Sequence, residues 1–176
     1  MNEKKYVNRV RELLSEAKEL EKYTITAYEC LIYNVIIIDG VYTPKEPMMP
    51  KKNNYAYETD LLIKKGDTPL VVIEVKTDTL STHDILVYSS KALAHKSIYP
   101  YLRYGLLAGG KNFIPKRFFI HNTGFDFAMS MNEYEDIASL VFIIEEQISV
   151  AKMLLKILTG KKKIKHYQSI KKRGEK

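Results

Sequence analysis

Hydrophobic positions recur at spacings of three and four residues in two long segments of the chain, which predicts an amphipathic helix in each. The first segment covers residues 3 to 22, and the second covers residues 132 to 158, where Gly160 ends the pattern. A further helix is predicted from about 82 to 98, because Ser81 or Thr82 supplies an N-cap and Pro100 follows its end.

Apolar runs bounded by turn residues predict the strands. Two adjacent strands are expected between Tyr55 and Asp78, with Gly66 to Pro69 as the turn that joins them. Further strands are predicted at 102–108 and 118–121. Residues 26 to 39 begin with helical character and end in β-branched residues, so their pattern leaves helix and strand both open. This order of elements predicts an α/β protein of three layers, with a central mixed sheet flanked by helices.

Three charged residues lie in the apolar surroundings of the two adjacent strands. Asp60 belongs to the first, and Glu74 and Lys76 belong to the second. Residues i and i+2 of a strand point to the same face, so Glu74 and Lys76 project together, and pairing with the first strand brings a second carboxylate beside them. Two carboxylates and one ammonium on one face are the groups that metal-assisted phosphodiester cleavage needs. The structural alternatives are Asp60 capping a turn, and Glu74 pairing with Lys76 on a solvated face.

The length of 176 residues fits one domain, over residues 1 to 160, followed by a basic C-terminal tail over residues 161 to 176. The formal net charge of +7 and the pI of about 9.2 favour polyanionic partners such as nucleic acid. The tail holds eight Lys or Arg residues and one Glu, so it fits either a solvated tail or an arm that contacts phosphates.

Several classes of protein are excluded by features that the sequence lacks. No apolar run approaches the ~20 residues that cross a membrane, and the polar N-terminus lacks the apolar region of a signal peptide. A cytoplasmic location is therefore expected. The single cysteine, Cys30, excludes an internal disulfide and a cysteine-rich zinc site. The glycines between 105 and 110 do not fit a phosphate-binding loop, so no nucleotide cofactor is expected.

The charged residues of the two strands follow a known order. Asp60, thirteen intervening residues, Glu74-Val75-Lys76 and then a predicted helix together resemble the PD-(D/E)xK nuclease superfamily. The resemblance covers roughly residues 25 to 122. Thr59 stands where the family motif has proline, a departure that is common in the superfamily. The resemblance implies a restriction-endonuclease-like core.

The resemblance also implies roles for individual residues. Asp60, Glu74 and Lys76 would be catalytic. Asp60 and Glu74 would bind one or two Mg²⁺ ions, with Mn²⁺ as the substitute and the backbone carbonyl of Val75 as a third ligand, because hard cations prefer oxygen ligands. Lys76 would orient the attacking water or stabilise negative charge in the transition state.

Two further sets of candidates come from positions where the family places functional residues or from the basic character of the chain. Glu29 is the candidate for an additional metal-binding acid ahead of the first strand, and Glu19 is the second choice. The candidate nucleic-acid contacts are basic residues on and after the helix predicted at 82–98, namely Lys91, His95, Arg103, Lys111 and Arg117.

These features predict a Mg²⁺-dependent deoxyribonuclease, of the restriction or defence type, that cuts within DNA. Cleavage of both strands of a duplex needs two active sites, so a homodimer is expected, with the long helix or the first helix at its interface. One alternative is a catalytically silent nucleic-acid-binding protein with the same fold. A second alternative is an interaction domain whose basic charge serves solubility alone.

Overall fold

The centre of the protein is a five-stranded mixed sheet. The computed structural model describes residues 2–43, 50–51, 55–132 and 134–166. The strands of this sheet lie in the order β1 (Thr24–Ala27), β6 (Leu61–Lys65), β7 (Thr68–Lys76), β8 (Arg103–Gly109) and β9 (Phe127–Met131). The pairs β1–β6 and β6–β7 are antiparallel, and β7–β8 and β8–β9 are parallel. The predicted α/β class and central mixed sheet are therefore confirmed.

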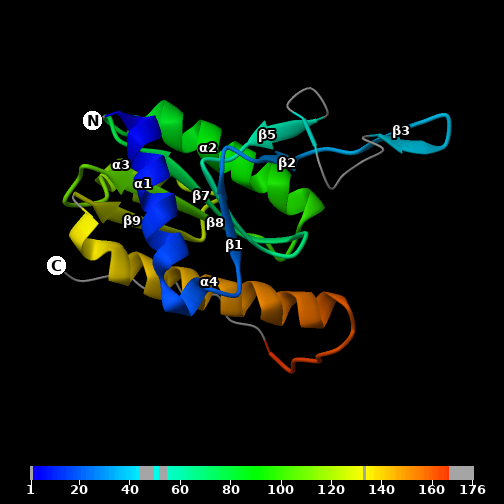
Figure 1. Cartoon of the computed structure of the whole chain (residues 1–176). Helices are drawn as coiled ribbons and strands as arrows, with labels where there is room; N and C mark the ends of the chain where they lie inside the picture. The colour runs from blue at the N-terminus through cyan, green and yellow to red at the C-terminus, as the bar shows by residue number, and fades with distance from the viewer. Residues whose placement is uncertain (1, 44–49, 52–54, 133, 167–176) are drawn as a thin grey trace.

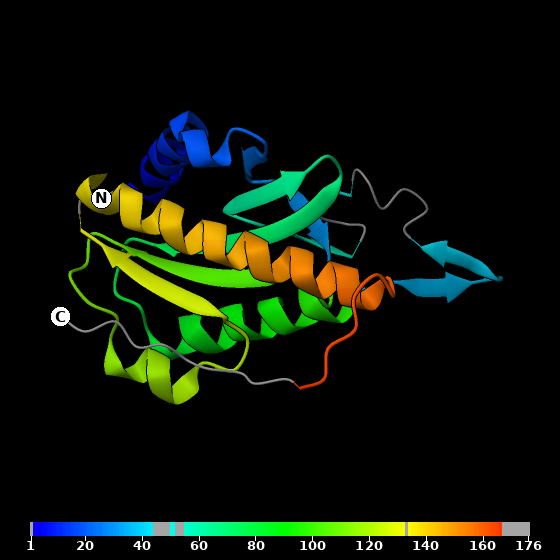
Figure 2. The same ribbon diagram turned by 90° about the horizontal axis from the view of Figure 1, so that it is seen from below.

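Helices cover both faces of this sheet. On one face, α1 (Glu3–Glu16) and α4 (Ile137–Leu158) pack into the larger apolar core with β7 and its neighbours. On the other face lie α2 (Thr82–Ile98) and α3 (Lys116–His121), which share a second apolar cluster with β7 and β8. Figure 2 shows the sheet edge-on between these two layers. A short 3-10 helix, η1 (Lys18–Leu20), follows α1, and another, η2 (Tyr134–Asp136), precedes α4.

The central strand β7 is covered on both sides. All seven residues from Pro69 to Val75 are buried, which agrees with the continuous apolar run that the sequence shows there. Because its neighbours β6 and β8 complete the backbone hydrogen bonding, the strand offers no free edge. Glu74 therefore lies inside the protein core rather than on a solvated face.

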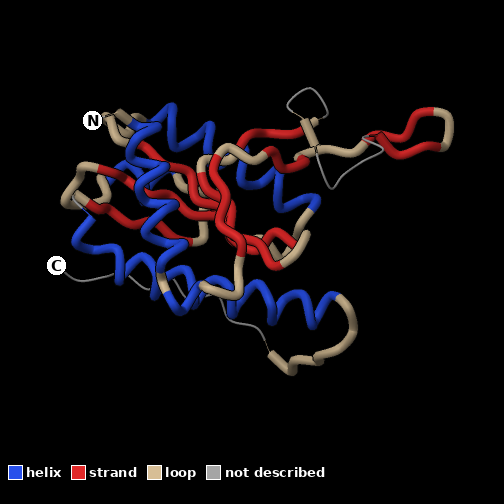
Figure 3. The backbone as a smooth tube through the Cα atoms, viewed as in Figure 1, coloured by secondary structure: helices blue, strands red, loops and turns tan. Residues whose placement is uncertain are grey.

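Two small antiparallel ribbons extend from one end of the main sheet. The first ribbon pairs β2 (Cys30–Ile32) with β5 (Ala56–Glu58), and the second pairs β3 (Ile36–Ile38) with β4 (Val41–Thr43). Figure 1 shows the β3–β4 ribbon projecting away from the body, and Figure 3 shows that both ribbons are extended chain. The helical character expected at the start of residues 26–39 is wrong, because cross-strand pairing there outweighs local helix propensity.

Other sequence expectations are confirmed or corrected by single elements. The helix at 82–98 and the strand at 102–108 are present as α2 and β8. The strand expected at 118–121 is wrong, because these residues form the end of the short helix α3, in which only Phe118 is buried. The first helix ends at Glu16 rather than 22, and the last begins at Ile137 rather than 132. Strand β9 was not expected from the sequence.

The described part of the basic tail has no regular secondary structure. Residues 161–166 form no helix or strand, and residues 167–176 lie outside the described part of the chain. Among the helices of the described residues, none combines the length and the apolar character needed to span a bilayer.

Candidate functional site

Asp60 lies at a junction between two sheets. It follows the β2–β5 ribbon and directly precedes β6, whose first residue, Leu61, pairs with Ile73 of β7. This register brings the Asp60 side chain to β7, where its Oδ2 accepts a 2.7 Å hydrogen bond from the Val75 backbone N–H. The predicted approach of Asp60 to the Glu74 strand is therefore present in the structure.

Glu74 is a buried carboxylate, with 1% of its surface exposed. Its Oε1 accepts a hydrogen bond of 2.6 Å from the Tyr104 hydroxyl and lies 2.7 Å from the Lys91 ammonium. Lys91 also donates to the Glu58 carbonyl at 2.5 Å, so helix α2 is tied to β7, which carries Glu74, and to β5, which precedes Asp60. Buried charges require such partners. Both of these contacts use Oε1, so neither of them occupies Glu74 Oε2.

Burial and the nearby charge of Glu74 alter the protonation of Asp60. Burial raises the pKa of Asp60 to about 7, and the negative charge of Glu74 adds to the rise. The Val75 N–H and the Lys91 charge act in the opposite direction without cancelling it. A divalent cation bound at Asp60 would replace its proton, because metal ligands must be deprotonated.

Lys76 lies at the end of β7, two residues after Glu74. Its ammonium lies 3.8 Å from Asp84 Oδ1 in the first turn of α2, which is a long contact, and the side chain keeps part of its surface exposed. Asp84 itself closes a capping box with Ser81, so its position is fixed by the helix start. Lys76 is therefore held near the strand end while it remains able to reach a ligand there.

The additional acid near Asp60 comes from α1. Glu3 accepts a hydrogen bond of 3.2 Å from the Thr77 backbone N–H, and its charge contributes to the raised pKa of Asp60. Glu29, the candidate from the sequence, is instead held by Lys64 and Thr26, each at 2.6 Å. Sequence reasoning missed Glu3, whose only signal was an acid in the first turn of the first helix.

Tyr28 lies at the same junction as Asp60 and has an unusual backbone conformation. Its φ of 59° places a bulky aromatic residue in the left-handed region, which costs energy and is seen at functional sites. Its backbone N–H donates to the Asp60 carbonyl at 3.3 Å. Its hydroxyl is buried and has no hydrogen-bond partner within the described residues. Burial raises the pKa of Tyr28, and the charges of Asp60 and Glu3 add to the rise.

The predicted nucleic-acid contacts do not form one surface. His95 is fully buried and bonds to the Leu31 carbonyl and the Tyr104 hydroxyl, so its expected role in binding DNA is wrong. Burial lowers the pKa of His95 to about 4, so it is neutral at pH 7. Lys91 points into the site towards Glu74 rather than outward. Arg103 is paired with Asp126 at 3.1 Å.

The two remaining basic candidates lie on the protein surface. Arg117 is exposed on α3, and Lys111 is partly exposed just after the end of β8. Strands β7 and β8 are parallel, and Lys76 at the end of β7 pairs with Ala108 of β8. Lys111 comes three residues after Ala108, so it lies beyond the same end of these strands as Lys76. Lys111 is therefore the better placed of the two to contact a ligand of the carboxylate site.

No family model, no curated protein and no solved structure matches the chain.

The described side chains do not by themselves supply a complete set of metal ligands. Within residues 2–43, 50–51, 55–132 and 134–166, no three Asp, Glu, His or Cys side chains converge on one point that would hold an ion. Asp60 and Glu74 supply two carboxylates. Mg²⁺ fits such a pair, because it binds through one or two carboxylates and keeps several waters. The predicted Val75 carbonyl ligand stays a prediction.

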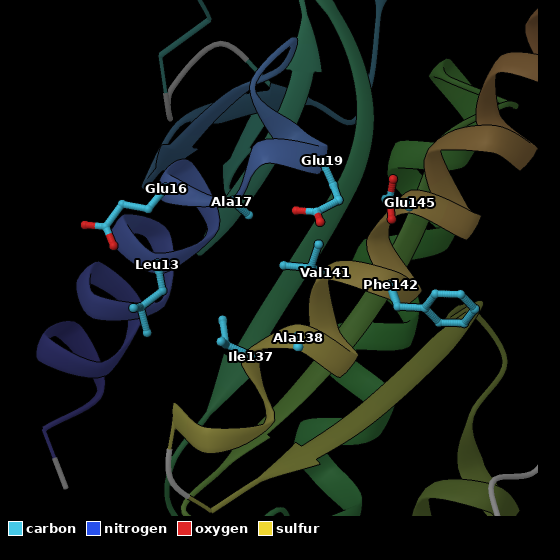
Figure 4. A pocket seen from close by; sticks show the side chains of 9 residues that line it. All are labelled: Leu13, Glu16, Ala17, Glu19, Ile137, Ala138, Val141, Phe142 and Glu145. Atoms are coloured by element: carbon cyan, nitrogen blue, oxygen red, sulfur yellow. The ribbon is translucent and has the colours of Figure 1, made fainter.

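A separate hollow lies away from these carboxylates, between α1 and α4. It has a volume of about 430 Å³ and is lined mainly by apolar side chains, with Glu16, Glu19 and Glu145 among its walls. Figure 4 shows it between the end of α1 and the first half of α4. Of the residues considered above for the carboxylate site, Glu19, the second choice for an additional metal-binding acid, lines this hollow instead.

Proposed function

We propose that the protein is a Mg²⁺-dependent deoxyribonuclease with a restriction-endonuclease-like core. The observation that carries the proposal is the buried Glu74 on the central strand, with Asp60 bonded to the next residue of that strand and Lys76 at its end. A folded protein seldom retains a buried carboxylate with a second, partly buried carboxylate beside it unless the groups are paired or serve a ligand or a reaction. The strand order and the helices on both faces support the fold assignment.

Each residue of the site has its own role in the proposed hydrolysis. Asp60 and Glu74 would hold the metal, which supplies a Lewis acid for the phosphate and lowers the pKa of a bound water. Lys91 and Tyr104 fix Glu74 through Oε1, so that Oε2 keeps one orientation. Lys76 orients the attacking water or stabilises the charge that develops on the phosphate. Direct attack by water requires no covalent intermediate.

The substrate and the assembly are part of the same proposal. The net charge of +7 suits a polyanion such as DNA. Two strands of a duplex need two sites, so a homodimer is the form that would cut both. Nicking of closed circular DNA would distinguish internal cleavage from action at ends.

One observation favours a second candidate, a nucleic-acid-binding protein with the same fold that does not cut. Lys91 already compensates the charge of Glu74 at 2.7 Å, so the carboxylate does not need a metal in order to stay buried. In that case DNA binding would be indifferent to metal and to the loss of the carboxylates.

The test is a cleavage assay on supercoiled and linear DNA in Mg²⁺, in Mn²⁺ and in EDTA. Glu74→Gln keeps the shape of the side chain, and Lys76→Met leaves the buried pair intact. Each variant is expected to cut at least about a hundredfold more slowly, as when a group that stabilises the transition state is removed. Glu146→Gln, on the exposed side of α4, is the matched control and should cut like the wild type.

Three outcomes would decide the matter. Metal-dependent cutting that both variants lose and the control keeps supports the nuclease. Cutting that survives in EDTA contradicts the metal mechanism. An absence of cutting in both metals, together with DNA binding that Glu74→Gln leaves unchanged, favours the silent binding protein.

A further inference from the structure

Two tyrosines stack on the ribbon beside the carboxylate site. The rings of Tyr33 and Tyr57 lie 3.9 Å apart between centroids, with an angle of 11° between their planes. Tyr57 pairs with Leu31 across the ribbon, and Tyr33 lies two residues beyond Leu31 on the same side, which explains the diagonal contact. Tyr57 remains 38% exposed, so the stack ends at the protein surface.

The tyrosine pair is joined to the carboxylate site through two routes. The Lys91 ammonium lies 6.0 Å from the centre of the Tyr57 ring and 2.7 Å from Glu74. The His95 ring contacts the Tyr57 ring in a T-shaped arrangement at 5.7 Å between centroids, and His95 contacts the Tyr104 hydroxyl that binds Glu74. The same groups therefore orient the ring and the carboxylate, so the aromatic surface is already in place before a ligand arrives.

The chemistry of this region suits bases rather than phosphates. Residues 30–43 and 55–58, which make up both ribbons, contain no lysine or arginine. Phosphate contacts in nucleic-acid complexes come chiefly from such cations, whereas base faces are met by aromatic and apolar side chains. The exposed side chains of the β3–β4 ribbon continue this apolar character: Ile37, Ile38, Val41 and Tyr42.

We propose that the Tyr33–Tyr57 pair is a stacking site for one unpaired base of the strand whose phosphate lies at Asp60 and Glu74. The inference rests on the proposed function and adds its substrate class, which is DNA with unpaired nucleotides at the point of cleavage. In an intact duplex the faces of each base are covered by its neighbours. A protein ring can take a base face only where the strand is single or its stack is broken.

Binding is tested first, in EDTA, so that the result does not depend on cleavage. The probe is a single-stranded oligonucleotide with one 2-aminopurine, whose fluorescence falls when the base stacks on an aromatic ring. The wild type is compared with Tyr57→Leu, which removes the ring, and with Tyr57→Phe, which keeps it. Tyr42→Leu is the control, because Tyr42 is also an exposed tyrosine but belongs to the β3–β4 ribbon and is not part of the stacked pair.

Loss of stacking should weaken binding about ten- to a hundredfold in Tyr57→Leu and abolish its fluorescence quenching, while Tyr57→Phe and Tyr42→Leu behave like the wild type. The wild type should also bind the single strand and a gapped duplex more tightly than the intact duplex. Equal quenching in Tyr57→Leu would overturn the proposal. So would a change in sedimentation mass in that variant without a change in DNA binding, because the pair would then be a protein interface.

Cleavage in Mg²⁺ separates this inference from the function on which it rests. A wild type that quenches the probe but cuts no DNA contradicts the nuclease and leaves the stacking site supported. A wild type that cuts intact duplex best, with Tyr57→Leu equally active, supports the nuclease and refutes the stacking site.

Discussion

The substitution Asp60→Asn is expected to stabilise the folded protein at neutral and alkaline pH, although it removes a ligand of the proposed metal site. The pKa of Asp60 is raised from its ordinary value of 3.8 to about 7, mainly by burial and then by Glu74. Between these values the folded protein holds a proton that the unfolded chain releases, so the wild type loses stability as the pH rises from about 4 to about 7. Asparagine does not titrate, so the variant avoids this loss.

The size of the effect follows from the shift. About three pKa units at 1.36 kcal/mol each give about 4 kcal/mol as an upper limit, and partial access to water lowers this to about 2–4 kcal/mol at pH 8. The amide oxygen of asparagine can still accept the Val75 N–H bond, so little packing or hydrogen bonding is lost. Near pH 4 the wild-type carboxyl is protonated in the folded state, and the gain should fall towards zero.

The assay is urea unfolding in EDTA at pH 5, 6, 7 and 8, with the free energy of unfolding compared between the wild type and Asp60→Asn. Asp67→Asn is the control, because Asp67 lies in the exposed turn between β6 and β7 and should show no such pH trend. A difference between wild type and variant that is the same at pH 5 and pH 8, or a variant that is less stable at pH 8, would refute the reasoning.

Two further substitutions test the surroundings of the carboxylates. Tyr28→Phe removes a buried hydroxyl that has no partner within the described residues, so thermal or urea unfolding should show a gain of about 1–3 kcal/mol; a loss of stability would mean that the hydroxyl is bonded. Lys91→Met should cost about 3–5 kcal/mol because it leaves Glu74 buried and uncompensated, and adding Glu74→Gln should recover most of that cost. Additive effects of the two changes in the same unfolding measurement would show that the pair does not interact.

The three residues proposed as catalytic could be found from the sequence because their local signals are strong. Glu74 and Lys76 interrupt a continuous apolar run, and such residues are conspicuous in a buried strand. The approach of Asp60 to that strand followed from the tight turn between β6 and β7, which fixes their pairing. Helix α2 was predictable for the same reason, since its capping box and the following proline mark both ends.

The residues that surround these three could not be predicted from local sequence patterns. Glu3 reaches the site from α1, 57 residues before Asp60 in the chain, through the packing of a helix on a sheet. The pattern of α2 showed that Lys91 and His95 share a face but gave no sign that this face points inward. Strand β9, at the sheet edge, mixes small and sulfur-containing residues and lacks the alternation that would reveal a strand.

The junction that carries Asp60 gives the two ribbons a mechanical connection to the carboxylates. The chain crosses between the main sheet and the β2–β5 ribbon at two points, and the crossings are bonded to each other by Tyr28 N–H to the Asp60 carbonyl and Thr59 N–H to the Glu29 carbonyl. Asp60 thus lies at this junction. If the proposed metal and base both bind, any displacement of the ribbon by the base would also move the carboxylate, and each ligand would then change the affinity for the other by the same factor.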